Sequence, residues 1–193
     1  LAPGQAKAIK HSIQDEWVPL KDGVDPTQPY LCRLPSGRTI TLFFYNGAIS
    51  QSVAFNGLLN NGKQFAKALL SGLRNDDTPQ LSHIATDGET YGHHHRYGEM
   101  ALSDCITYLQ QQPQLRLTNY AQYLKLFPPT IFVQIHEDSS WSCVHGVERW
   151  KADCGCCTGG NPQWNQQWRK PLRDALDWLR DQLLVIFFFF FRK

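Results

Sequence analysis

Residues 81–95 read LSHIATDGETYGHHH, and this stretch decides how we interpret the fold. Its first six residues are short, largely apolar and flanked by Pro79 and by Asp87-Gly88, which predicts a buried strand that ends in a turn. Two carboxylates and three histidines follow at once. Because functional side chains gather where parallel strands end at their carboxyl edge, we expect a site at this exit.

The neighbouring segments predict alternating strands and helices. Residues 39–45 (TITLFFY) are typical of a buried strand, and apolar side chains at three- and four-residue steps over 52–73 predict one amphipathic helix. Strand, helix and strand imply a parallel pair, so the chain is predicted to be α/β, either a barrel or an open doubly wound sheet. Outside this unit, residues 1–38 are interpreted as a long loop. We expect a strand over 131–135 and helices over 101–109, 118–127 and from Pro171 onward.

Composition and charge narrow the class of partner. The 193 residues carry 19 basic against 17 acidic side chains, a net charge of +2, so no basic face indicates nucleic acid or an anionic membrane. The oligomeric state stays open.

We expect residues 1–182 to form one domain. The apolar tail 183–193 is too short for a membrane helix, and we expect it to be a frameshift or cloning artefact. Cysteine usage and the lack of a secretory signal predict a reducing, cytoplasmic compartment.

Asp87 and Glu89 are the first candidates for chemistry. They lie one glycine apart, and Coulomb repulsion between two carboxylates favours a proton on one of them. Glycoside hydrolysis needs a protonated carboxylic acid for the leaving oxygen and a second carboxylate for the anomeric carbon. An ordinary solvated turn is the alternative interpretation of the same pair.

The segment Asp87-Gly88-Glu89-Thr90-Tyr91-Gly92 resembles the fourth signature region of glycoside hydrolase family 57, in which the aspartate is the acid/base residue. The resemblance covers nearly the whole chain. The segments that carry it are LAPGQA, LFFYNGAIS, IATDGETYGHHHRYGEMAL, SSWSCVHGVERWKADCGC and WNQQWRKPLRDALDWLRDQL. Within the family, the chain is similar to a bacterial branch in which a helical region of unknown function follows the catalytic domain.

That resemblance implies an incomplete (β/α)7 barrel, a two-step retaining mechanism without a metal or organic cofactor, and an oligo- or polysaccharide substrate with α-linked sugars. It implies Asp87 as the acid/base residue, with Glu89 in support. The family's nucleophilic glutamate lies on an upstream strand, which we expect to precede Leu1, so the chain is expected to be an inactive fragment. Glu16 is the one early glutamate, and it lies in the irregular opening region.

Histidines and tryptophans are candidates for sugar binding. His93 and His95 could bind hydroxyl groups, although the adjacent side chains of a histidine run cannot all point the same way. Trp141 and Trp150 follow the strand predicted over 131–135, with His145 between them, and indole faces stack on pyranose rings. Packing as core aromatics is the alternative for both tryptophans.

Two metal hypotheses remain open. One is a zinc site formed by His83, Asp87, His93 and His95, although their spacing fits no regular zinc motif. The other uses the cluster of Cys143, Cys154, Cys156 and Cys157, with His145 nearby, as a structural zinc or iron–sulfur centre. A redox-labile disulfide or free thiols in a Gly-rich loop are the alternatives for the cysteines.

The sequence therefore supports three functional hypotheses. The first is part of an α-glycan hydrolase or transglycosylase. The second is a noncatalytic glycan-binding protein that keeps the aromatic groove, and the third is a metal-binding or redox-sensing protein. The sequence separates neither hydrolase from transferase nor one glycan from another.

Overall fold

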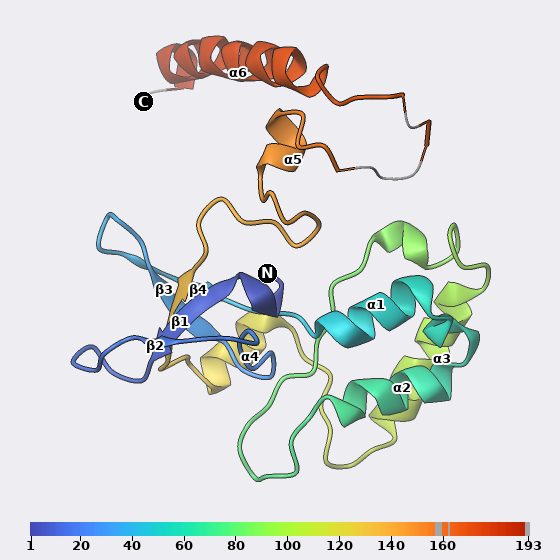
Figure 1. Ribbon diagram of the computed structural model, residues 1–193. Coiled ribbons are helices and arrows are strands. Elements are labelled where there is room, and N and C mark those ends of the chain that lie inside the picture. The colour runs from blue at the N-terminus through green and yellow to red at the C-terminus, as the bar shows by residue number, and fades with distance from the viewer. Residues whose placement is uncertain (157–159, 162, 192–193) are drawn as a thin grey trace. The chain divides into compact units, whose positions relative to one another are not determined.

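The computed structural model describes residues 1–156, 160–161 and 163–191. The chain forms two compact units, Leu1–His136 and Glu137–Lys193, which are described separately (Figure 1). The elements of the first unit are, in chain order, β1 (Ala6–Lys10), β2 (Val18–Pro19), β3 (Tyr30–Arg33), β4 (Thr39–Leu42), α1 (Gly47–Phe55), α2 (Gly62–Ser71), α3 (Gly98–Gln110), α4 (Tyr120–Leu126) and β5 (Phe132–Ile135), with single turns of 3-10 helix at Pro3–Gln5, Leu58–Asn60 and Gly88–Thr90.

The strands form one mixed sheet of five strands in the order β2-β1-β5-β3-β4. β5 is central, antiparallel to β1 and parallel to β3, where Leu31 lies opposite Phe132. β2 and β4 extend the two edges in antiparallel orientation. The α/β class is confirmed, but the expected sheet of parallel strands is wrong. β3 and β4 are joined by a short hairpin, and a connection of that length brings back an antiparallel strand.

Two segments at the start of the chain differ from their predictions. Residues 1–38, interpreted as a loop, contain β1, β2 and β3. Their strand character was hidden because each strand is short and lies between proline- and glycine-rich turns. The strand predicted at 39–45 exists as β4, but it is a sheet edge, and Thr39 and Ile40 are exposed. The buried side chain is Phe44, which follows the strand.

The sheet has its own hydrophobic core. Tyr30 and Phe44 are almost fully buried, and their rings meet edge to face with centroids 5.7 Å apart. That geometry is favourable for aromatic pairs and adds to the stabilisation from burial. The other buried members of this core are Ala6, Val24, Cys32 and Val133.

Helices α1, α2 and α3 form a second core in the same unit. The single helix predicted over 52–73 is two helices, because Gly57 adopts a positive φ of 70° and interrupts the first. Each new helix begins at an asparagine: Asn46 accepts a hydrogen bond from the Ile49 N–H, and Asn61 accepts one from the Gln64 N–H. These caps satisfy backbone donors that the first helical turn leaves unpaired.

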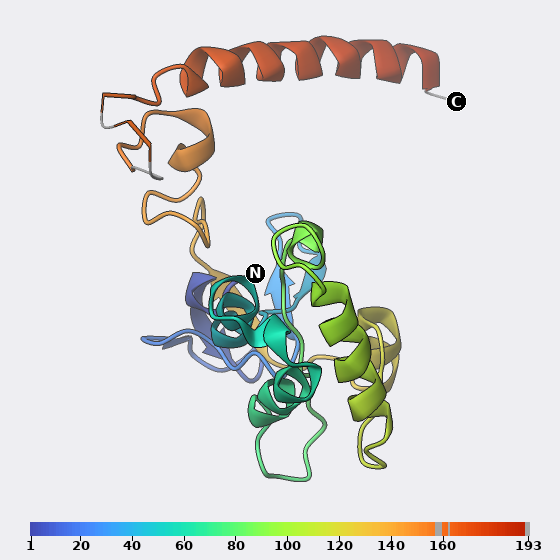
Figure 2. The same cartoon turned by 90° about the vertical axis from the view of Figure 1, so that its right-hand side faces the viewer.

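The contact between α2 and α3 is close. Phe65 and Ala66 of α2 pack with Ala101 and Cys105 of α3, all four buried. A Cβ atom on Gly62 would lie 2.5 Å from the Ala101 carbonyl oxygen, so glycine is required where the helices approach. The helices predicted at 101–109 and 118–127 and the strand at 131–135 are confirmed as α3, α4 and β5. Figures 1 and 2 show α1, α2 and α3 lying together.

The segment 81–87 is not a strand, contrary to the prediction from LSHIAT. The Leu81 N–H donates to the Thr27 carbonyl oxygen, and the His83 carbonyl oxygen accepts from the Asn46 N–H. The Ala85 N–H donates to the Ser50 hydroxyl. Its backbone therefore pairs with a loop and with the start of α1 rather than with a neighbouring strand.

The second unit contains α5 (Glu148–Lys151) and the long helix α6 (Arg169–Phe191), which confirms the helix expected around Pro171. Ion pairs at helical spacing lie along α6. Lys170 pairs with Asp174 at 2.8 Å, and Asp177 pairs with both Arg173 and Arg180. No helix among the described residues is both long and apolar enough to span a bilayer. The domain boundary expected at residue 182 stays a prediction, and α6 continues across it.

Candidate functional site

Asp87 ends the irregular segment 81–87 and is followed by the single 3-10 turn Gly88–Thr90; its own backbone is extended, with φ −66° and ψ 139°. The Thr90 N–H donates to the Asp87 carbonyl oxygen at 3.1 Å, and Thr90 is buried. The Asp87 side chain is exposed and forms no capping hydrogen bond to the turn. The backbone of this residue is therefore fixed while its carboxyl group is accessible from solvent.

The turn continues into a compact loop that carries the histidines. The Glu89 carbonyl oxygen accepts from the N–H groups of His93 and His94, at 3.1 and 3.0 Å. The His95 N–H donates to the Thr90 carbonyl oxygen, and the Gly92 N–H donates back to the His95 carbonyl oxygen. These reciprocal bonds fix the loop without any regular strand or long helix.

The histidine side chains point to different surroundings. His95 Nε2 lies 2.9 Å from the Ala54 carbonyl oxygen near the end of α1, so this ring anchors the loop to the helix. His93 and His94 are exposed, with their rings 4.9 Å apart in an edge-to-face contact. Glu89 is also exposed. Asp87, Glu89 and His93 thus all present polar groups to solvent from one short loop.

His83 has a structural environment. Its Nδ1 lies 3.0 Å from the Tyr120 hydroxyl and its Nε2 lies 3.1 Å from the Pro26 carbonyl oxygen. Burial lowers the pKa of His83, which favours the neutral ring. Phe43 and Tyr120 pack against the same ring. Both ring nitrogens are engaged, so His83 is poorly placed for a metal site with Asp87, His93 and His95.

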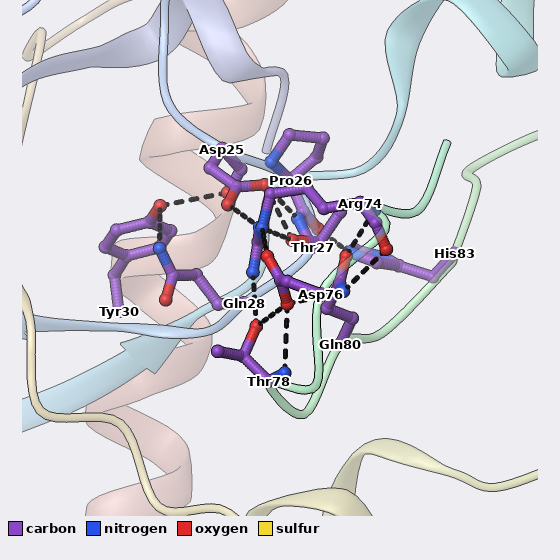
Figure 3. Close-up of polar contacts among 10 residues, drawn as sticks. All are labelled: Asp25, Pro26, Thr27, Gln28, Tyr30, Arg74, Asp76, Thr78, Gln80 and His83. Atoms are coloured by element: carbon purple, nitrogen blue, oxygen red, sulfur yellow. Dashed lines mark hydrogen bonds and ion pairs between the residues drawn. The ribbon is translucent and has the colours of Figure 1, made fainter. Parts of the chain in front are cut away.

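A polar network fixes the loop that leads into this segment (Figure 3). The Arg74 guanidinium forms an ion pair with Asp25 and another with Asp76, the latter at 2.9 Å. Thr27 and Thr78 accept further hydrogen bonds from the same guanidinium. Arg74 therefore joins the loop after α2 to the loop before β3.

The network shifts the pKa values of two of its members, Asp76 and Tyr30. The Thr78 hydroxyl, and then Arg74, lower the pKa of Asp76 to about 2. Burial raises the pKa of Tyr30 to about 12, and the Tyr30 hydroxyl donates to the Asp25 carbonyl oxygen at 2.9 Å. Our sequence interpretation missed this network. The signal for it was the sequence Asp25-Pro26-Thr27, since aspartate and threonine side chains readily close such turns.

A cleft of about 1030 Å³ lies between the end of α2, the segment 73–83 and α4. Its walls include apolar side chains such as Leu69, Leu73 and Leu109, together with polar side chains of Arg74 and His83. Asp87 is not among its lining residues. This cleft is therefore distinct from the Asp87 loop.

Trp141 and Trp150 belong to the second unit. Trp141 is 68% exposed and Trp150 is 51% exposed, so neither is a core aromatic. Trp150 lines a cavity of about 400 Å³ whose other walls come from Arg149, Trp168 and the first turns of α6. The groove that we expect these tryptophans to share with Asp87 stays a prediction.

The cysteine loop brings four donor side chains together. The donor atoms of Cys143, His145, Cys154 and Cys156 all lie within 4.8 Å of one another, and within the described residues no other histidine, cysteine or carboxylate group gathers in this way. Cys157, a sequence candidate for this site, lies outside the described residues. His145, which the sequence also offered as a sugar-binding candidate, lies with these thiols, and its sugar-binding role stays a prediction.

The thiols influence each other's titration. Hydrogen bonding with Cys143 raises the pKa of Cys156 to about 11, whereas the backbone of Cys156 lowers the pKa of Cys154. The three described thiols of the cluster are free cysteines. The Cys143 and Cys156 sulfurs lie 3.6 Å apart, well beyond the roughly 2.0 Å of a disulfide bond.

Two protein-family models match most of the chain. A family model described as glycosyl hydrolase family 57 matches residues 9–136, and a model described as a domain of unknown function (DUF3536) matches residues 164–188. Among curated proteins, no sequence matches. The crystal structure of 4-alpha-glucanotransferase from Thermococcus litoralis is similar with a TM-score of 0.46 and 20% identity, over 60% of this chain. The chain spans 18% of the length of that structure.

Proposed function

The chain belongs to glycosyl hydrolase family 57, and from this membership we propose that it forms part of a retaining enzyme that cleaves or transfers α-linked glycans, with Asp87 as the acid/base residue. The observation that carries the proposal is the setting of Asp87. Its carboxyl group is open to solvent at the start of a loop whose backbone is fixed by hydrogen bonds. A sugar could reach this carboxyl group without any movement of neighbouring side chains, because the Asp87 side chain is exposed.

In the proposed first step, the protonated Asp87 gives its proton to the glycosidic oxygen as the bond to the anomeric carbon breaks, and a second carboxylate forms a bond to that carbon. In the second step, Asp87 takes a proton from water or from an acceptor sugar hydroxyl, which attacks the same carbon and releases the carboxylate. Retaining enzymes hold the two carboxyl groups about 5–5.5 Å apart. Following the family resemblance, we assign the nucleophile to residues outside this chain.

Other residues are given supporting roles. We assign Glu89 and His93 to hydrogen bonding with sugar hydroxyls, because both are exposed on the Asp87 loop. His95 holds the loop through Ala54 and contacts substrate only through its remaining ring nitrogen. Trp141 and Trp150 are proposed as stacking surfaces for pyranose rings. The incomplete (β/α)7 barrel, the domain over residues 1–182 and the cytoplasmic location belong to the same proposal.

The test separates proton donation from folding and binding. In the longer enzyme that contains this segment, we expect Asp87→Ala to lower turnover of malto-oligosaccharides by about 100-fold or more, since general acid catalysis contributes on that order. Turnover of α-glucosyl fluoride should fall much less, because fluoride leaves without a proton. Azide should restore part of the rate and yield the α-glucosyl azide.

The control variant is Asp22→Asn, a change at an exposed carboxylate elsewhere in the same unit, which should leave the rates unchanged. Equal turnover of the natural substrate by Asp87→Ala would refute the assignment.

A noncatalytic glycan-binding role is the alternative, and the exposure of Trp141 and Trp150 favours it. This alternative predicts that the longer protein binds α-glucans but turns over neither malto-oligosaccharides nor α-glucosyl fluoride. Loss of glucan binding in Trp141→Ala and Trp150→Ala, with no activity in the unmodified protein, would support it over the enzyme.

A further inference from the structure

The cysteine loop of the second unit has the composition of a metal site. Three thiols and one imidazole, from Cys143, His145, Cys154 and Cys156, converge on one point. We propose that these four side chains bind one Zn²⁺ ion as a closed, structural centre. Thiolate and imidazole are the donors that zinc prefers, and four protein donors leave no open position for catalysis.

The distances between donor atoms fit one ion. Zinc–sulfur bonds near 2.3 Å and zinc–nitrogen bonds near 2.0–2.1 Å, arranged as a tetrahedron, place two sulfurs about 3.8 Å apart and a sulfur and a nitrogen about 3.6 Å apart. The Cys143 and Cys156 sulfurs are 3.6 Å apart. His145 Nδ1 lies 3.6 Å from the Cys143 sulfur and 3.3 Å from the Cys156 sulfur. These three donors already have nearly the spacing that the bound ion requires, and the Cys154 sulfur lies within 4.8 Å of each of them.

The same distances disfavour the other occupants. A disulfide needs two sulfurs at about 2.0 Å, and the described thiols are free. An iron–sulfur cluster inserts inorganic sulfide between its irons and its cysteine ligands, and it is held by four cysteines in its common forms. A set of three thiols and one histidine whose donor atoms all lie within 4.8 Å of one another matches a single ion instead.

Backbone geometry brings the donors to this point. Gly155 lies between Cys154 and Cys156 with a φ of 75°, and Gly146 follows His145 with a φ of 62°. Such left-handed positions let the chain reverse sharply beside each pair of donors. Both turns therefore aim side chains two residues apart at the same point.

Neighbouring polar groups complete the site. Three thiolates and a neutral histidine around Zn²⁺ carry a net charge of −1, and Arg169 Nη1 lies 3.8 Å from the Cys154 sulfur, where its charge offsets this. Gln166 Oε1 accepts from the same guanidinium at 3.0 Å, and its Nε2 donates to the Cys156 carbonyl oxygen. The proposed centre is thereby joined to the start of α6.

The first experiment measures metal content. The whole 193-residue chain, purified under reducing conditions with zinc in the growth medium, should contain one zinc per chain by elemental analysis. Cys156→Ser should weaken zinc affinity at least about 100-fold, because losing a direct ligand costs more than losing an outer partner. Cys105→Ala, a matched change at a buried thiol of the first unit, should retain the metal. Equal zinc loss in both variants would overturn the proposal.

The second experiment needs no variant and remains decisive if Cys156→Ser fails to fold. The intact chain, stripped of metal with a chelator and reductant, is titrated with Co²⁺. We expect the strong visible absorption of tetrahedral cobalt, a thiolate-to-cobalt band in the near ultraviolet, and loss of both when Zn²⁺ is added. Weak octahedral absorption alone, or a disulfide between Cys143 and Cys156 found by mass spectrometry in zinc-grown protein, would refute the zinc centre.

Discussion

The Nδ1 atom of His83 lies 3.0 Å from the hydroxyl of Tyr120, so the first residue of α4 contacts the segment that leads to Asp87. The opposite ring nitrogen lies 3.1 Å from the Pro26 carbonyl oxygen. One neutral imidazole therefore holds together three segments that are distant in sequence. Its titration affects the stability of the whole loop system.

The first prediction concerns pH. The folded His83 has a pKa below the ordinary 6.5, because burial disfavours its charged form. Below pH 6.5 the unfolded chain therefore binds more protons, and the free energy of unfolding should decrease as the pH falls through that value. Thermal unfolding between pH 7.5 and 5 measures the effect. His83→Gln should flatten this part of the profile, whereas His94→Gln at an exposed ring should not. An identical slope in both variants would contradict the prediction.

The second prediction concerns Arg74. Arg74→Met removes the ion pairs to Asp25 and Asp76, and we expect it to lower the free energy of unfolding by on the order of 1 kcal/mol, since these side chains are partly exposed and screened by solvent. Urea denaturation in low and high salt measures the loss, which should shrink as salt increases. Arg116→Met, at an exposed arginine, is the matched control and should change little. A loss that is independent of salt would point to lost packing instead.

The third prediction compares two glycines of the cysteine loop. At Gly146 an added Cβ would lie 2.0 Å from the Asp138 carbonyl oxygen, and φ is 62°. Gly155 has a φ of 75° but no atom near its added Cβ. Gly155→Ala should therefore cost only backbone strain, about 1 kcal/mol, and Gly146→Ala should cost clearly more. The midpoint of urea unfolding of each variant, with and without zinc, checks the order. The reverse order would show that the Asp138 contact can relax.

Local signals in the sequence were sufficient for several elements. Regular apolar spacing identified α3, and the pair Pro128-Pro129 marked where α4 ends. These features depend on a few neighbouring residues, so a sequence pattern can reveal them.

The features that were missed depend on residues distant in sequence. Whether LSHIAT pairs as a strand depends on Thr27 and Asn46, which take up its backbone groups. The antiparallel orientation of β4 relative to β3 depends on the hairpin that joins them. The sequence left a metal centre as one of several alternatives for the cysteines and His145, because the convergence of their donor atoms depends on two sharp turns at glycines. Periodicity carries no information on such contacts.

The central position of β5 constrains the order in which the first unit can fold. β1 and β3 do not pair with each other. Both pair with residues 132–135, which lie about 100 positions after β3 and more than about 120 after β1, so the sheet closes only once this strand is present. The core of α1, α2 and α3 is complete by residue 109. During synthesis on the ribosome this helical core can consolidate while the early strands still have unsatisfied edges. Those edges are then the part of the nascent chain most exposed to mispairing with other chains.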